Sequence, residues 1–90
     1  MSKRIVVLAS GGGSNFEALA TYFDALGASS PGQIVAALSD RRAAGVIGRA
    51  EQRGIAGRWL SPADRADLGT VLADWRADIV VLAGYLKNEN

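Results

Sequence analysis

The sequence contains no cysteine and no histidine. Without cysteine the chain can form neither a disulfide scaffold nor a catalytic thiolate, and this composition fits a reducing compartment. Without histidine, any mechanism that needs an imidazole is excluded for these residues, so acid–base chemistry at neutral pH would require a carboxylate or a lysine with a shifted pKa. We also predict no metal site.

A strong charge of one sign and a long apolar run are both missing. Ten lysines and arginines stand against nine acidic residues, which gives a formal net charge of +1, and the arginines are spread along the chain. Neither nucleic acid nor an anionic membrane is therefore expected as a partner. No apolar stretch approaches the ~18 residues that span a bilayer, and residues 5–9 are too short for a signal peptide. We expect one cytoplasmic domain over residues 1–90.

Apolar segments of strand length alternate with segments of helical spacing. The patterns predict strands at residues 4–9, 33–38, 55–60 and 79–83. They predict helices over about residues 16–26 and 42–53, and a third helix after Ser61 with apolar positions 68, 71, 72 and 75. The expected start signals are a capping box of Ser14 with Glu17, a cap at Ser39 or Asp40, and the pair Ser61-Pro62.

This order of elements defines a fold class. Alternating strands and helices, with strands that are continuously apolar, predict an α/β fold with a parallel sheet covered on both faces. With right-handed crossovers, the expected architecture is an open parallel sheet of four strands in the order 3-2-1-4, with three helices on both faces. Ligands of such sheets bind at the carboxyl ends of the strands where the order reverses. Residues 11–15 and 84–87 should therefore lie side by side as one candidate site.

The stretch Ser10-Gly11-Gly12-Gly13-Ser14-Asn15 joins the first strand to the first helix. Its glycines allow a positive φ and a close approach of a ligand to the main chain. Free N–H groups and the positive end of a helix dipole favour an anion there, phosphate above all. A plain glycine turn with Ser14 as a helix cap is the alternative interpretation.

Two better-known phosphate motifs fit this stretch poorly. Phe16 stands where the dinucleotide fingerprint has its third glycine, and the Gly-Lys-Ser/Thr of a P-loop is missing. Asp40, at the end of the second predicted strand, is placed either to bind a ribose or to cap the next helix.

Residues 5–16 resemble the amino-terminal signature of the glycinamide ribonucleotide formyltransferase family, in which a strand runs into Ser-Gly-x-Gly-Ser-Asn. The similarity continues at residues 37–40, 50–55 and 78–86, and so covers nearly the whole chain in the right order. The resemblance implies the Rossmann-like half of a formyltransferase domain. It also implies a folate-dependent transfer of a formyl group from 10-formyltetrahydrofolate, the co-substrate, to the amine of glycinamide ribonucleotide in purine biosynthesis.

The resemblance further implies site residues. The matching positions are Gly13, Ser14 and Asn15 for the substrate's phosphate, and Arg65, Leu86 and Lys87 for the folate. The family's catalytic asparagine, histidine and aspartate lie beyond the fourth strand, and neither Asn88 nor Asn90 matches them. No catalytic residue is therefore assigned, and we expect a chain that is truncated after the fourth strand and inactive alone.

Two other functions stay open. A small Rossmann-like dinucleotide-binding module would use the glycine turn together with Asp40 and would bind NAD. Residues 79–83 form the most apolar strand and lie at the edge of the predicted sheet, where such a strand is prone to pair with another chain. A homodimer through this edge is the second alternative.

Overall fold

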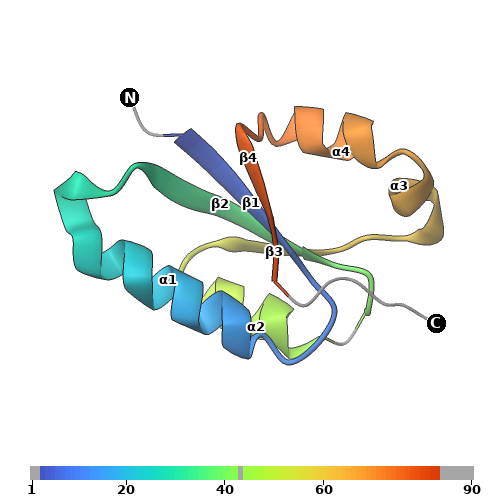
Figure 1. The fold of residues 1–90 in the computed structure, drawn as a ribbon. Helices are drawn as coiled ribbons and strands as arrows, with labels where there is room; N and C mark the ends of the chain where they lie inside the picture. The colour runs from blue at the N-terminus through green and yellow to red at the C-terminus, as the bar shows by residue number, and fades with distance from the viewer. Residues whose placement is uncertain (1–2, 43, 84–90) are drawn as a thin grey trace.

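A four-stranded parallel sheet forms the middle layer of the protein (Figure 1). The computed structural model describes residues 3–42 and 44–83. The strands are β1 (Lys3–Ala9), β2 (Gly32–Ser39), β3 (Ala56–Trp59) and β4 (Ile79–Leu82). They pair in the order β3-β2-β1-β4, and each pair is parallel, so the predicted fold class and strand order are confirmed.

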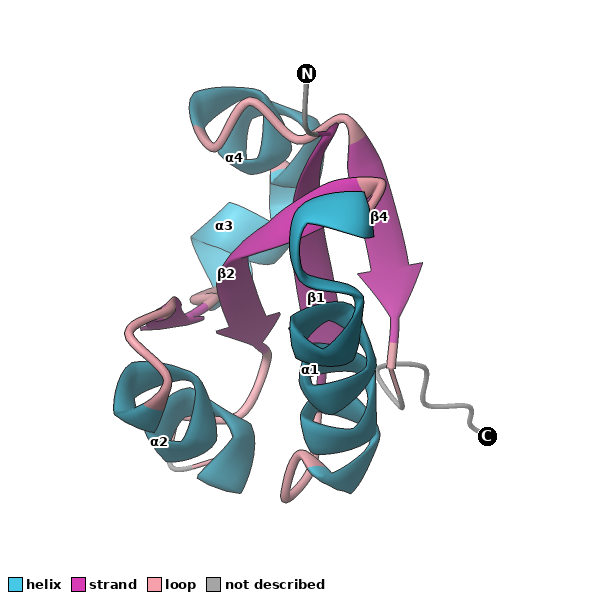
Figure 2. Ribbon diagram, turned by 90° about the vertical axis from the view of Figure 1, so that its left-hand side faces the viewer, coloured by secondary structure: helices cyan, strands magenta, loops and turns pink. Residues whose placement is uncertain are grey.

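Helices cover both faces of this sheet (Figure 2). The helices are α1 (Ser14–Leu26), α2 (Gly45–Gln52), α3 (Pro62–Ala66) and α4 (Leu68–Asp74), and a 3-10 turn, η1 (Gly27–Ser29), follows α1. One face of the sheet carries α1 and α2, and the other carries α3 and α4. The first two crossovers place α1 and α2 on one face and the third places α3 and α4 on the other, so both faces of the central strands are covered.

The central strand β1 has side chains in both halves of the core. Val7 packs in one cluster with Phe16 of α1 and Val46 of α2. Val6 packs in a second cluster, on the other face, with Leu60 and with partly buried residues of α4. All five side chains are almost completely buried. Burial on both faces explains why β1 reads as a continuous apolar run rather than an alternating one.

The third predicted helix is in fact two short helices, so the described residues form four α-helices rather than three. Its start is as predicted, because the Ser61 hydroxyl accepts from the Asp64 N–H and the Asp64 carboxylate accepts from the Ser61 N–H, both at 3.1 Å. Asp67 then leaves the helical region, with φ −126° and ψ 45°. Its carbonyl O accepts from the N–H of Thr70 at 3.1 Å and of Val71 at 3.3 Å, which starts α4.

The capping box predicted for the first helix is wrong. The N-cap of α1 is Gly13, and no side chain caps this helix end. Ser14 is already the first helical residue, whereas a capping box needs its serine at the N-cap position. Glu17 instead forms ion pairs with arginines of the α2 region.

The predicted start of the second helix is also wrong. Neither Ser39 nor Asp40 caps α2, which begins only after Ala44. The N–H of Val46 donates instead to the carbonyl O of Gly11 at 3.4 Å. A main-chain group of the glycine turn, far away in the sequence, thus takes the place of a side-chain cap.

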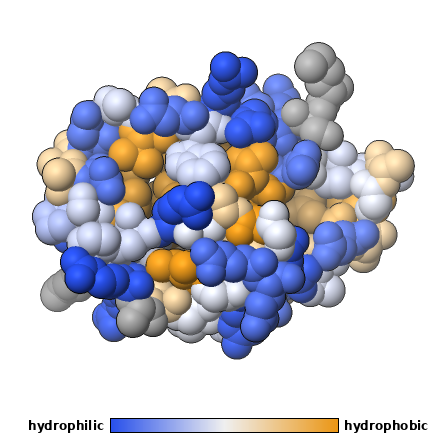
Figure 3. Space-filling model, turned by 180° about the vertical axis from the view of Figure 1, so that it is seen from behind, coloured by the Kyte–Doolittle hydropathy of each residue, from blue (hydrophilic) through white to orange (hydrophobic). Residues whose placement is uncertain are grey.

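The edge strand β4 carries exposed apolar side chains. Within the described part of the chain β4 pairs only with β1, and it exposes Ile79 (41%), Val80 (40%) and Leu82 (61%). On the side of the molecule opposite to the view of Figure 1, hydrophobic atoms show only in small areas among hydrophilic ones (Figure 3). The β4 edge therefore combines apolar side chains with main-chain groups that can pair.

Candidate functional site

The glycine turn connects the buried end of β1 to the start of α1. Ser10 and Gly13 are buried, while Gly11 and Gly12 are exposed to solvent. Gly13 has φ 91° and ψ 18°, in the left-handed region that residues other than glycine seldom adopt. The turn therefore depends on glycine at position 13 for its path.

Gly13 is required for a second reason, since α2 passes directly against it. A Cβ atom at this position would lie 2.8 Å from the Cα of Val46 and 2.9 Å from the Cδ of Arg49. Gly45, the first residue of α2, also lies against the turn, because a Cβ there would lie 3.0 Å from the carbonyl O of Gly12. The turn is thus held in close backbone contact with the first turns of α2.

All three glycine carbonyls of the turn point back into the protein. The carbonyl O of Gly11 accepts from Val46 of α2, and that of Gly13 accepts from the N–H of Glu17 at 2.8 Å. The carbonyl O of Gly12 accepts from the Nε of Arg49 at 2.7 Å. In a trans peptide the N–H points opposite to the C=O, and the structure has no cis peptide bond in the part of the chain that it describes.

The N–H groups of the same peptides consequently point outward. They belong to Gly12, Gly13 and Ser14, and within the described residues they have no hydrogen-bond acceptor. The first N–H groups of α1 add to them, because a helix leaves its first turn of N–H groups without intrahelical partners. The result is a cluster of donors at the positive end of a helix of 13 residues, which is an arrangement that suits an anion.

A hollow of about 510 Å³ opens beside the turn. Its lining residues are Ser10, Gly11, Gly12, Arg41, Ala44 and Gly45. Arg41 is exposed and contributes the only charged side chain among them. Sequence reasoning did not single out Arg41, because it follows a strand that is far from the turn in sequence and only the sheet order brings the two together.

A second hollow, of about 470 Å³, lies at the opposite ends of β2 and α1. Apolar side chains such as Phe23, Ile34 and Ile55 line it. Its two charged side chains form an ion pair, in which the Nη1 of Arg53 lies 2.7 Å from the Oδ2 of Asp24. The donors that could hold an anion are therefore concentrated at the glycine turn.

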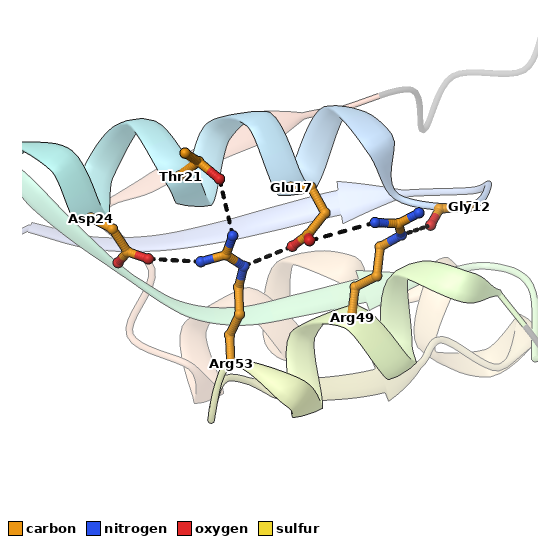
Figure 4. Close-up of polar contacts among 6 residues, drawn as sticks. All are labelled: Gly12, Glu17, Thr21, Asp24, Arg49 and Arg53. Carbon is orange, nitrogen blue, oxygen red and sulfur yellow. Dashed lines mark hydrogen bonds and ion pairs between the residues drawn. The ribbon is translucent and has the colours of Figure 1, made fainter.

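A chain of ion pairs ties α1 to the α2 region (Figure 4). Glu17 lies between Arg53, whose Nε is 2.7 Å from its Oε1, and Arg49, whose Nη1 is 3.5 Å from its Oε2. Arg53 also donates to Asp24 at 2.7 Å and to the Thr21 hydroxyl at 3.0 Å. The hydrogen bond from Arg53 is the main reason why the pKa of Glu17 lies below its ordinary value of 4.5. Because these groups are partly exposed, we expect the network to orient side chains more than to add stability.

The predicted site residues fall into separate groups. Gly13, Ser14 and Asn15 lie together at the turn, with Ser14 and Asn15 exposed. Leu86 and Lys87 lie outside the described residues, and so does the predicted neighbouring segment 84–87.

Arg65 occupies a different place from the glycine turn. It lies in α3 and its Nη1 donates to the carbonyl O of Leu60 at 2.8 Å and of Asp40 at 3.2 Å. These bonds hold the segment before α3 against the end of β2. The carboxylate of Asp40 caps no helix, and its Oδ1 is buried without a hydrogen-bond partner among the described residues.

Two further features bear on the class of protein. Among the described residues, no group of three or more acidic, histidine or cysteine side chains is placed to hold a metal ion. None of the helices in residues 3–42 and 44–83 has the length and apolar character needed to cross a membrane.

The fold and the turn define a Rossmann-like α/β domain with a glycine-rich turn between its first strand and first helix. The profile of the formyl transferase family matches residues 3–88. The chain belongs to the formyl transferase family.

Solved phosphoribosylglycinamide formyltransferases are similar to this chain over nearly its whole length. The protein from Brucella melitensis is 35% identical with a TM-score of 0.84, and the match covers 98% of this chain and 48% of that one. The protein from Anaplasma phagocytophilum is 32% identical with a TM-score of 0.81, and the match covers 100% of this chain and 43% of that one. Glycinamide ribonucleotide transformylase 1 from Geobacillus kaustophilus is 29% identical with a TM-score of 0.81, and the match covers 100% of this chain and 50% of that one. The chain thus spans about half the length of these proteins.

A formyltetrahydrofolate deformylase from Pseudomonas putida shares the fold alone, at 19% identity and a TM-score of 0.77. No curated protein sequence matched the chain.

Proposed function

We propose that the glycine turn binds the phosphate of glycinamide ribonucleotide, and that the chain is the substrate-binding half of a phosphoribosylglycinamide formyltransferase. The observation that carries this proposal is the orientation of the turn. Its carbonyls are bound to the protein and its N–H groups face outward at the start of α1. The identity of the substrate is inferred from the names of the similar solved structures.

The donors for a phosphate come from three consecutive residues. The main-chain N–H groups of Gly13, Ser14 and Asn15 lie at the N-terminal end of α1, where the helix dipole also favours negative charge. The side chains of Ser14 and Asn15 are exposed and add a hydroxyl and an amide. Arg41, in the wall of the hollow, supplies a positive charge for the anion.

The co-substrate in this proposal is 10-formyltetrahydrofolate, and Arg65, Leu86 and Lys87 stay predicted folate contacts. In the proposed reaction the amine nitrogen of the substrate bonds to the formyl carbon and the bond between that carbon and N10 of the folate breaks. A proton passes from the amine to N10, so that tetrahydrofolate leaves. The 90 residues contain no histidine, and none of their side chains is assigned to this proton transfer. We therefore expect the chain alone to bind the substrate, and formyl transfer by it to stay at the uncatalysed rate.

Titration of the ¹⁵N-labelled chain tests the binding. Millimolar glycinamide ribonucleotide, and inorganic phosphate at higher concentration, are expected to shift the amide signals of residues 11–15. Asn15→Ala removes one side-chain donor and should weaken binding about tenfold, the low end of what is expected for one hydrogen bond to a charged group. The matched control is Gln33→Ala, which removes an exposed amide at the opposite end of β2 and should leave the affinity unchanged.

Signals of residues 11–15 that stay in place at millimolar ligand would contradict the proposal. NAD, added in the same way, separates the dinucleotide alternative. We expect it to bind poorly because Phe16 of α1 fills the core between this helix and the sheet, whereas the fingerprint has a glycine there for close packing of helix and strand. NAD binding that is weakened by Asp40→Ala would favour the alternative instead.

We also propose that two copies of the chain pair through the outer edge of β4. The specific observation is the exposure of Ile79, Val80 and Leu82 on a strand that pairs on one side only within the described residues. An exposed apolar edge strand is a template for pairing with a further strand.

Sedimentation equilibrium measures this association. We expect a dimer at high micromolar concentration, with a dissociation constant that Leu82→Lys raises about tenfold or more, because a charged edge residue opposes pairing. Tyr22→Lys is the control, since Tyr22 is as exposed (59%) but lies on α1, and it should leave the dimer intact. A wild-type chain that sediments as a monomer would rule out this association.

A further inference from the structure

We infer that Arg49 is a positioning residue of the phosphate site: it holds the peptide between Gly12 and Gly13 so that the Gly13 N–H faces the ligand. This inference rests on the proposed function of the turn. It assigns a role to a residue on α2 that does not itself need to touch the ligand.

Arg49 reaches the turn from one side (Figure 4). Its Nε donates to the carbonyl O of Gly12 at 2.7 Å, which is the only hydrogen bond to that carbonyl among the described residues. Its Cδ lies 2.9 Å from the place where a Cβ of Gly13 would be, so the side-chain stem packs along the glycine. The guanidinium and the stem together hold both residues of this peptide.

The restrained peptide is one that would otherwise rotate easily. It joins two glycines, and glycine adopts positive and negative φ about equally well. No atom lies within 4 Å of a Cβ built on Gly12, and the residue of α2 that faces its main chain is Gly45, which has no side chain to hold the peptide. If the peptide flipped, the carbonyl O would face the ligand in place of the Gly13 N–H, and an acceptor would repel a phosphate.

Glu17 holds Arg49 in this position. Its Oε2 lies 3.5 Å from the Nη1 of Arg49, and its Oε1 is hydrogen-bonded to Arg53. Arg53 keeps the pKa of Glu17 below its ordinary value, so the carboxylate is ionised at neutral pH. The guanidinium of Arg49 therefore has one partner on each side, a carboxylate on α1 and the carbonyl of the turn.

Arginine suits this role better than lysine. Its planar guanidinium presents several donors at fixed angles, so that Nε and Nη1 serve two acceptors at once. A lysine would keep the charge but could not hold both acceptors in the same geometry. Comparing the two residues therefore separates positioning from simple charge attraction.

The test compares Arg49→Gln and Arg49→Lys with a matched control, Arg53→Gln. The control removes the same charge and the stronger bond to Glu17, but no bond to the glycine turn. Thermal unfolding of each variant is measured first. We expect Arg53→Gln to lower the stability at least as much as Arg49→Gln, because Arg53 is more buried and makes three side-chain hydrogen bonds.

Inorganic phosphate is the ligand in the binding test. The affinity of Arg49→Gln should fall about tenfold, because the Gly13 N–H is no longer held toward the phosphate and its hydrogen bond to this charged group is lost, while that of Arg53→Gln should change less than about twofold. Arg49→Lys should stay weakened severalfold. Wild-type affinity in Arg49→Gln, or full rescue by lysine, would overturn the positioning role.

A readout without ligand separates this inference from the proposed function. In the free protein, Arg49→Gln should shift or broaden the amide signals of Gly12, Gly13 and Ser14, whereas Arg53→Gln should leave them in place. If the wild-type chain does not bind phosphate, the proposed function fails, and the free-state signals still decide whether Arg49 holds the turn. Unchanged signals in Arg49→Gln would refute the inference.

Discussion

Replacing Gly13 by alanine is expected to abolish phosphate binding and to lower the free energy of unfolding by about 2–5 kcal/mol. A side chain in the left-handed region costs roughly 1–2 kcal/mol. A methyl group placed 2.8 Å from the Cα of Val46 adds an overpacking cost of about 1–3 kcal/mol, because a backbone atom cannot move aside as a flexible side chain can. The turn and α2 must separate to admit it, and the N–H groups of the site then lose their common orientation.

Gly11→Ala is the matched control for this prediction. A Cβ at Gly11 meets no atom within 4 Å, and its φ is outside the left-handed region. We expect a change of at most about 0.5 kcal/mol in stability, as for most surface substitutions. Urea unfolding and phosphate titration of both variants check the pair. A Gly13→Ala protein with wild-type stability and affinity would show that the turn has another conformation in solution.

Phe16→Ala is expected to destabilise the chain by about 3–5 kcal/mol, the cost of emptying a fully buried aromatic site. Phe16 is the largest of the fully buried side chains and packs α1 against the sheet in the core that also contains Val7 and Val46. A domain of 90 residues has a total stability of about 5–13 kcal/mol, so this loss leaves it marginal. The phosphate site should weaken as well, because Phe16 anchors the first turn of α1.

Tyr22→Ala separates this core effect from a general loss of aromatic surface. Tyr22 lies on the same helix but is 59% exposed, and its removal should cost about 1 kcal/mol or less. Chemical denaturation followed by far-ultraviolet circular dichroism measures both variants. Equal losses for the two substitutions would contradict the burial of Phe16.

The periodicity of the sequence was sufficient to predict the layers of the fold. Residues 5–9 and 34–38 are apolar without a break because both faces of β1 and β2 are covered, and this property is local to each strand. The strand order followed from alternation of strands and helices and from the handedness of crossovers. The pattern Ser61-Pro62 was also a reliable start signal, since the capping box of Ser61 with Asp64 needs only residues within one turn.

Helix starts that depend on distant residues were not predictable in this way. Ser14 and Glu17 have the spacing of a capping box, but Glu17 pairs with Arg49 and Arg53, which only the packing of α2 beside α1 brings near. The start of α2 depends on the carbonyl of Gly11. In the third helical segment the apolar stripe was correct, but the helix is interrupted before it at Asp67, which leaves the helical conformation and whose carbonyl O starts a new helix.

The sequence by itself determined the parallel sheet, its strand order, and a glycine-rich turn at the start of the first helix, because hydrophobic periodicity and glycine content act locally. Only the tertiary structure decided how the turn is oriented. Its carbonyls are bound by Val46 and Arg49, and Gly13 takes a positive φ against α2. These partners come from a segment that lies more than thirty residues further along the chain and meets the turn only in the folded protein.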